Sequence, residues 1–209
     1  MKKIVILMIS VFAANLLFAQ QVSYSEFKAG IINPEDAKTG WMFTYGTGKT
    51  IDESFSWLVE FNLYKKTYNK DSRVPLPEQE DLVQREIENN SYLMPLLFKL
   101  SFDKKLIPPS PFVIRGSAGI GYQFMLNKEK NNVEGEEKSR FYHGFAYQLS
   151  AGAGIEISSS AILFAEAFYH GGKVKRDKKD VDGLPTWIEK DVSGVGFRVG
   201  VNFVNFGLF

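Results

Sequence analysis

The sequence contains no cysteine and only two histidines. Without cysteine, neither a lipoprotein anchor nor a disulfide framework is available, and a metal site would have to use histidine and carboxylates alone. Beyond the N-terminus the chain also lacks long apolar runs and any sustained helical period, which argues against a helical fold. The fold must therefore be stabilised without disulfide cross-links.

Neither sign of charge dominates. The chain has 25 basic and 24 acidic residues. Two of the basic residues lie in the predicted export signal, so the mature protein would carry 23 basic residues and a net charge near −1. This balance does not indicate nucleic-acid binding, and no motif indicates a cofactor.

The N-terminus has the layout of a secretory signal peptide. Met1–Ala19 opens with Lys2 and Lys3, continues through an apolar core at Ile4–Phe12 and ends in small or apolar residues. A transmembrane anchor is the alternative, but polar residues interrupt the run, which is shorter than the roughly 20 apolar residues that a spanning helix needs. We predict cleavage at the end of this segment and a single mature domain, residues 20–209.

Period-two alternation of apolar and polar residues recurs along the mature chain, which predicts an all-β fold. The fold class that we expect is a single closed antiparallel up-and-down transmembrane β-barrel of about eight strands. The expected strands are residues 25–32, 40–48, 55–65, 92–102, 112–125, 142–157, 161–170 and 194–206. The fourth contains Pro95, which lacks a backbone N–H, so we expect a bulge or a strand end there.

The connections between these strands alternate between short and long. Short connections are expected at residues 50–54, 103–111 and 158–160, and longer charged ones at 33–39, 68–91, 127–141 and 171–193. Outer-membrane barrels have short periplasmic turns and long extracellular loops, and an even strand count returns the C-terminus to the periplasm. The pattern therefore predicts a bacterial outer-membrane location.

The two faces of the predicted strands differ in character. In the last strand Val195, Phe197 and Val199 share one face, while Arg198 lies on the other. Across the strands, the non-apolar faces carry ionisable residues of both signs: Lys28, Glu60, Lys99, Arg115, Glu156, Glu166 and Arg198. An eight-stranded barrel is nearly filled by its side chains, and buried charges are costly unless paired. We predict a lumenal ion-pair network; in the alternative, a soluble secreted β-sandwich, the same charges face water.

Three segments resemble the OmpA/OmpX-like family of small outer-membrane β-barrels: Gly116–Tyr122, Gly152–Glu156 and Gly200–Phe209. The resemblance covers essentially the whole mature chain. It implies that the terminal aromatic residue, Phe209, is part of the signal that the barrel-assembly machinery reads during insertion. Asn205 and Gly207 depart from the family pattern, which places bulky apolar residues there.

Two motifs invite a catalytic interpretation. Gly46–Thr50 resembles a phosphate-binding loop, but Phe43 occupies the position where that pattern requires its first glycine. His143 and His170 fall near the predicted extracellular rim, and Glu166 shares a strand face with His170, so a carboxylate could orient a general base. Some eight-stranded outer-membrane barrels modify lipid A, so the family resemblance implies a lipid A-modifying enzyme as the alternative to the non-enzymatic barrel that we expect.

The predicted loops carry mixed charge, with acids concentrated in residues 68–91 and bases in 173–179. Neighbouring basic groups favour anionic surfaces. The partners that we expect are outer-membrane lipids, with lipopolysaccharide as a candidate, and the barrel-assembly machinery during insertion. The barrel itself is expected to be a monomer with a structural or surface-interaction role.

Overall fold

The computed structural model describes residues 22–34, 39–76, 79–106, 110–181 and 184–204. Its elements are β1 (Ser23–Pro34), β2 (Gly40–Thr50), β3 (Phe55–Leu76), β4 (Gln79–Lys105), β5 (Phe112–Asn131), β6 (Glu136–Ser158), β7 (Ala161–Gly171), β8 (Lys173–Val181), β9 (Leu184–Asp191) and β10 (Gly194–Val204). The predicted signal peptide, Met1–Ala19, and the proposed assembly signal, Phe209, lie outside the described residues. No helix in the described ranges is long and apolar enough to cross a membrane.

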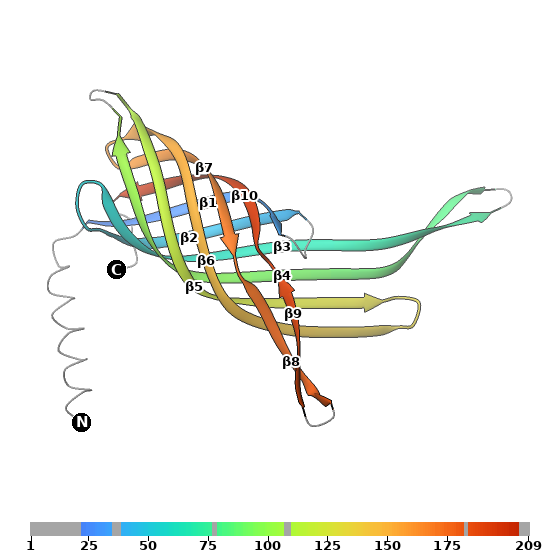
Figure 1. Cartoon of the computed structure of the whole chain (residues 1–209). Helices are drawn as coiled ribbons and strands as arrows, with labels where there is room; N and C mark the ends of the chain where they lie inside the picture. Colours follow the sequence, from blue (N-terminus) through green and yellow to red (C-terminus); the bar gives the residue numbers. More distant parts are fainter. Residues whose placement is uncertain (1–21, 35–38, 77–78, 107–109, 182–183, 205–209) are drawn as a thin grey trace.

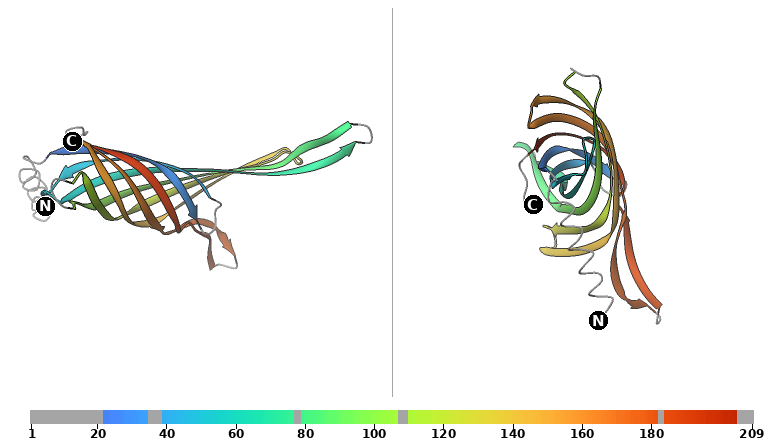
Figure 2. Two further views of the ribbon diagram at one scale, coloured as in Figure 1. Left: turned by 90° about the horizontal axis from the view of Figure 1, so that it is seen from above. Right: turned by 90° about the vertical axis from the view of Figure 1, so that its left-hand side faces the viewer.

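The strands form one antiparallel sheet that closes into a ring (Figures 1 and 2). The sheet order is β5-β4-β3-β2-β1-β10-β7-β6-β8-β9, and an additional pairing of β5 with β6 closes the ring. β8 and β9 lie outside this ring, so eight strands make the barrel wall. The predicted fold class, a closed barrel of about eight strands, is confirmed.

The first and last strands of the ring pair with each other. β1 and β10 are antiparallel, with Phe27 opposite Val201 and Lys28 opposite Gly200. On its other side β10 pairs with β7, where Arg198 lies opposite Glu166. The C-terminal strand predicted from face alternation therefore closes the barrel.

The long connections differ from the sequence prediction. Three of the expected loops, at residues 68–91, 127–141 and 171–193, are built mainly as β-hairpins: β3–β4, β5–β6 and β8–β9. They project beyond the ring at one end (Figure 1). Their charged sequences show no sustained alternation of apolar and polar residues, so periodicity could not detect these strands.

Pro95 lies within β4 rather than at its end. The β3–β4 ladder has pairs at Phe61–Leu96 and Tyr64–Leu93 but none at the two positions between them in these described strands. The register is the same on both sides of the gap, so the expected bulge or strand end is wrong. A proline cannot donate a ladder hydrogen bond, and this wall accommodates it by a local gap in pairing.

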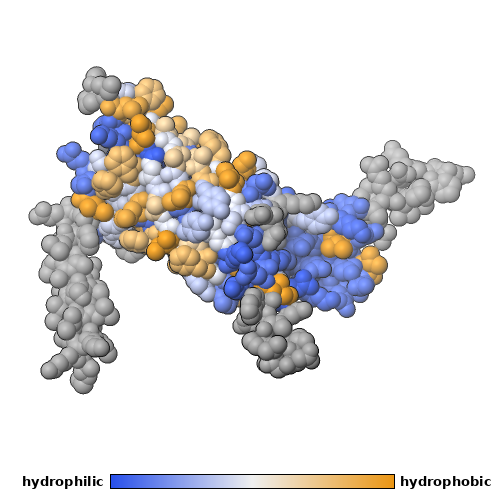
Figure 3. Space-filling view, viewed as in Figure 1, coloured by the Kyte–Doolittle hydropathy of each residue, from blue (hydrophilic) through white to orange (hydrophobic). Residues whose placement is uncertain are grey.

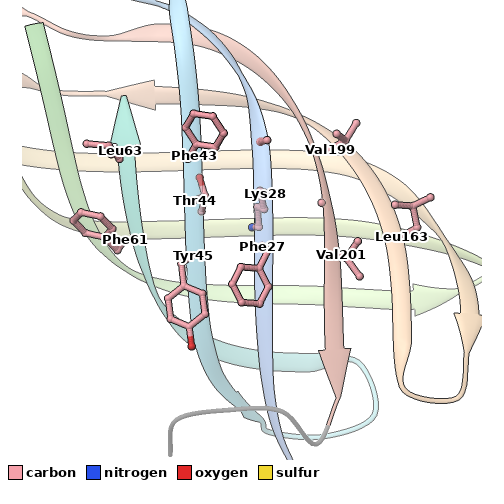
Figure 4. A pocket seen from close by; sticks show the side chains of 12 residues that line it. Phe27, Lys28, Phe43, Thr44, Tyr45, Phe61, Leu63, Leu163, Val199 and Val201 are labelled. Atoms are coloured by element: carbon pink, nitrogen blue, oxygen red, sulfur yellow. The ribbon is translucent and has the colours of Figure 1, made fainter. Parts of the chain in front are cut away.

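On the face shown in Figure 3, apolar side chains gather over the ring, and polar ones cover the coloured parts of the projecting hairpins. In β10, Phe197 and Val199 are 52% and 50% exposed, whereas Arg198 between them is 1% exposed. A groove of about 600 Å³ lies on the outer face of β1, β2, β3 and β10, where Phe27, Phe43 and other apolar side chains line it (Figure 4). The ring is therefore apolar on its outer face, and the charged side chain of Arg198 points inward, as the face assignment predicted.

Candidate functional site in the barrel lumen

Glu60 of β3 lies at the centre of a group of buried charges. Its carboxylate accepts contacts from Lys28 Nζ at 2.9 Å, Lys99 Nζ at 3.2 Å and Arg198 Nη1 at 3.3 Å. All four side chains are at most 2% exposed. Because these residues come from β1, β3, β4 and β10, the contacts tie together strands from different parts of the wall.

Glu166 of β7 is a second acidic centre. Arg198 Nε lies 2.5 Å from its Oε1, and Lys28 Nζ lies 3.4 Å from the same atom. The Ser150 hydroxyl donates to Oε2 at 3.1 Å. Lys28 and Arg198 thus contact both acidic centres, which makes the group a connected network instead of a set of isolated pairs.

Neutral polar side chains complete the contacts of this network. The Gln148 side-chain oxygen accepts hydrogen bonds from Lys99 Nζ and Arg198 Nη2, each at 2.9 Å. Arg198 also donates to Thr44 and Asn62 at 3.3 Å. Such partners offset the desolvation of buried charges, which coulombic attraction alone compensates poorly.

Glu26 extends the network toward the end of the barrel that has short turns. It forms ion pairs with Lys28 Nζ at 2.6 Å and with Arg115, which also pairs with Asp103 at 3.1 Å. The sequence interpretation missed Glu26 and Asp103. Their signal was position parity: Glu26 is two residues from Lys28, and Asp103 is four residues from Lys99, so each shares a strand face with a predicted lumenal residue.

Glu156 does not join this group. It forms an ion pair with Lys105 at 2.8 Å, and its side chain is 28% exposed. Glu156 lies near the end of β6, shortly before the short turn to β7. Glu156 lies on the inner face of its strand, as the sequence analysis expected. However, its position near the strand end places it at the rim of the barrel, away from the other six predicted residues.

Glycines provide the space for the charged side chains. In the strand register, a glycine of a neighbouring strand lies opposite each of the six charged residues that the structure brings together. These register pairs are Lys28–Gly200, Glu60–Gly46, Lys99–Gly119, Arg115–Gly152, Glu166–Gly152 and Arg198–Gly30. A Cβ atom at Gly152 would collide with the backbone of Ala165 and with Glu166.

An apolar layer fills the lumen at the end from which the hairpins project. Its buried side chains are Ile32, Met42, Tyr64, Leu93, Met125, Tyr142, Phe168, Val174 and Val192. Val174 belongs to β8 and Val192 follows β9, so the β8–β9 hairpin contributes directly to this layer. The Arg198 guanidinium lies 4.8 Å from the Phe168 ring centroid, which places the apolar layer directly on the charged one.

The two histidines occupy different surroundings. His170 lies near the end of β7 but is fully buried, and its Nε2 lies 2.8 Å from the side-chain oxygen of Gln123. The partners of Glu166 are Lys28, Arg198 and Ser150 rather than His170. His143 is exposed, and its Nδ1 lies 2.6 Å from the Tyr122 hydroxyl.

The described residues form neither a metal centre nor a phosphate-binding loop. Within the described ranges, no three residues among histidines and acids are grouped so that they could hold a metal ion. Gly46–Thr50 lies in β2, where its backbone pairs with β1 and β3. The charged lumen is therefore the most strongly organised polar site of the described chain.

Comparison with solved structures identifies the architecture. The chain is similar to a major outer membrane protein from Thermus thermophilus, with a TM-score of 0.60 and 10% identity over 88% of this chain and 99% of that one. It is also similar to the outer membrane protein OprG from Pseudomonas aeruginosa, with a TM-score of 0.51 and 13% identity over 88% and 95% of the chains. The chain has the fold of the small outer-membrane β-barrels.

Neisserial surface protein A (NspA) gives the same picture, with a TM-score of 0.50 and 14% identity over 87% of this chain and 96% of that chain. No family model and no curated protein matches the sequence. The small outer-membrane barrel that the OmpA/OmpX-like resemblance implied is thus confirmed as a fold. The predicted outer-membrane location agrees with these neighbours, all of which are bacterial surface or outer-membrane proteins.

Proposed function

We propose that this protein is an integral outer-membrane barrel with a closed lumen, which acts in envelope structure or surface interaction through its projecting hairpins. The main evidence for the closed lumen is the ion pair between Arg198 and Glu60, which joins non-adjacent strands across the lumen. Interlocked charged side chains of this kind occupy the space that a channel would need. The apolar layer above them adds a second obstruction.

The outer surface supports the membrane part of the proposal. Apolar side chains exposed by 40–60%, such as Phe43, Ile120 and Phe145, recur on the outer faces of successive strands. Soluble monomers rarely expose continuous apolar patches larger than a few hundred Å². A bilayer that surrounds the ring would cover this surface, whereas the same ring in solution would leave it in water.

The hairpins support a surface role. Their ion pairs, including Lys70–Glu86 at 2.7 Å and Arg140–Glu129 at 2.9 Å, have partly exposed partners of both signs. This composition suits strands that stand in water outside the bilayer. Hairpins of this composition could contact a protein partner or simply stand in the water at the cell surface. We also propose that the barrel-assembly machinery reads Phe209 during insertion.

The absence of cysteine makes a direct topology test possible, because any introduced thiol is unique. Ser139→Cys places a thiol at an exposed position in the β5–β6 hairpin, and Ser159→Cys places one in the turn between β6 and β7. A membrane-impermeant maleimide added to intact cells should label the first variant but not the second. Labelling of both after cell lysis controls for reactivity.

If only the Ser159→Cys variant were labelled on intact cells, the barrel would have the opposite orientation in the membrane. Recovery of the protein in the soluble fraction, without heat-modifiable migration in detergent gels, would overturn the proposal altogether.

A further inference from the structure

A second groove lies on the outer face where the apolar surface meets the polar hairpins. It has a volume of about 780 Å³ and is lined by Ile31, Thr39, Gly40, Trp41, Phe43, Lys65, Lys66 and Thr67. Phe43 also lines the groove shown in Figure 4, so the two grooves adjoin on one face of the wall. Together they form a track that is apolar along the barrel and basic at its outer end.

Lys65 is the first charged residue beyond the apolar column of β3. Along the same face, Phe61 and Leu63 precede it toward the middle of the barrel. In the register, Trp41 of β2 lies opposite Lys65 on one side and Tyr92 of β4 on the other. A cation flanked by two interfacial aromatic residues marks the level where lipid headgroups begin.

The charge of Lys65 is available to a ligand. Its contact in the described chain is a cation–π interaction, with Nζ 5.7 Å from the Tyr92 ring centroid, and no described carboxylate forms an ion pair with it. The basic segment at residues 173–179, which the sequence analysis considered for binding anions, is partly neutralised within its own hairpin. Lys173 and Lys175 both form ion pairs with Glu189, at 2.9 and 3.2 Å.

We propose that this track binds lipid A, with a phosphate at Lys65 and an acyl chain along Phe43 and Leu63 toward Phe27. The inference rests on the proposed function for its orientation, because the hairpin end must face the outer leaflet. The positive charge of Lys65 favours an anionic headgroup. Because an apolar groove adjoins it, a lipid that carries both a phosphate and an acyl chain fits better than free phosphate. The Trp41 ring, 64% exposed, supplies a platform beside the headgroup.

The chain offers a matched control at the other end of the same strand pair. Lys49 of β2 lies opposite Trp57 of β3, which repeats the lysine–tryptophan pair of Lys65 and Trp41 near the short turn between these strands. Purified protein in detergent is titrated with diphosphoryl lipid A, monophosphoryl lipid A and phosphatidylglycerol, and binding is followed by native mass spectrometry. The variants are Lys65→Gln, Lys65→Arg and Lys49→Gln.

Lys65→Gln should bind diphosphoryl lipid A about fivefold more weakly, while Lys65→Arg and Lys49→Gln bind like the natural protein. Removal of one phosphate from the lipid should weaken binding to the natural protein and add little to the loss in Lys65→Gln. Equal binding by the natural protein and Lys65→Gln would overturn the site. An equal loss for phosphatidylglycerol would overturn the assignment to lipid A.

Failure of this site and failure of the proposed function are distinguishable. Heat-modifiable protein that is found in the outer membrane but shows no dependence on Lys65 overturns only the lipid A site. Protein that is absent from the outer membrane overturns the proposed function. The comparison between the two forms of lipid A uses the natural protein and needs no variant to fold.

Discussion

Arg198 and Glu60 form an ion pair at 3.3 Å although β1 and β2 separate their strands in the barrel wall. The ion pair therefore spans the lumen and does not simply join two adjacent strands. Residues separated by 138 positions in the chain meet there. Because Lys28 and Lys99 share the same carboxylate, loss of Glu60 would leave three buried cations with too few acids.

Glu60→Gln should strongly destabilise the barrel. Removal of one member of a buried ion pair costs about 3–5 kcal/mol, and the replacement keeps nearly the same volume. The free energy of unfolding in urea, followed by tryptophan fluorescence in lipid vesicles, measures this loss. Asp71→Asn is the control, because it removes an exposed pair with Arg85 and should cost at most about 1 kcal/mol. Equal stability of the two variants would contradict a network held together by Glu60.

The glycine opposite two of the charges should tolerate no side chain. Gly152 lies opposite both Arg115 and Glu166, and an added Cβ would collide with the neighbouring backbone. Gly152→Ala should therefore lower the free energy of unfolding by about 1–3 kcal/mol. At Gly116 the nearest atom to an added Cβ is the Ser150 carbonyl oxygen at 3.8 Å, so Gly116→Ala is the matched control. A tolerated Gly152→Ala would show that the packing around the charges is loose.

Two valines on the outer face of β10 test the depth of the bilayer. Val199, next to Arg198, lies opposite Ala29 and Ala165, whereas Val195 lies near the hairpin end of the same strand. Val199→Arg should cost about 2–4 kcal/mol and Val195→Arg only about 0–1 kcal/mol, because the cost of a lipid-facing arginine falls toward the interface. Refolding into vesicles, with urea titration, gives both values. Equal costs, or the reverse order, would contradict this placement of the membrane.

Glu189 in the β8–β9 hairpin should titrate below the usual glutamate range. Hydrogen bonds from Lys173 and Lys175 lower the pKa of its carboxyl. A lowered folded-state pKa means that the ion pairs are retained as pH falls through the ordinary value of about 4.3, and are lost only as pH falls through the lowered value. NMR titration of the Glu189 carboxyl measures this midpoint, with Glu189→Gln to assign the signal. A midpoint at or above the ordinary value would show that these pairs do not persist in solution.

Strand faces were predictable from the sequence, but heights along the strands were not. Period-two parity assigned Arg198, Glu60 and Lys99 to the lumen, because neighbouring residues of a strand point to opposite sides. Parity also assigned Glu156 correctly to the inner face. It contains no information on the stagger between strands, which places Glu156 at the rim beside Lys105.

Other misses have different physical causes. β8 and β9 carry charges on both faces, so their sequences are typical of loops although their backbones pair. His170 shares a face with Glu166 and could have been assigned to the interior by parity. Its side-chain partner, Gln123 of β5, lies on the inner face of another strand.

The most direct test of the closed lumen is conductance in planar lipid bilayers. Natural protein, inserted from detergent and shown to be folded by heat-modifiable migration, should give no stable current, because Arg198, Glu60 and Lys99 occupy the centre of the barrel. A stable current of the size given by a porin, recorded from folded protein, would contradict the account.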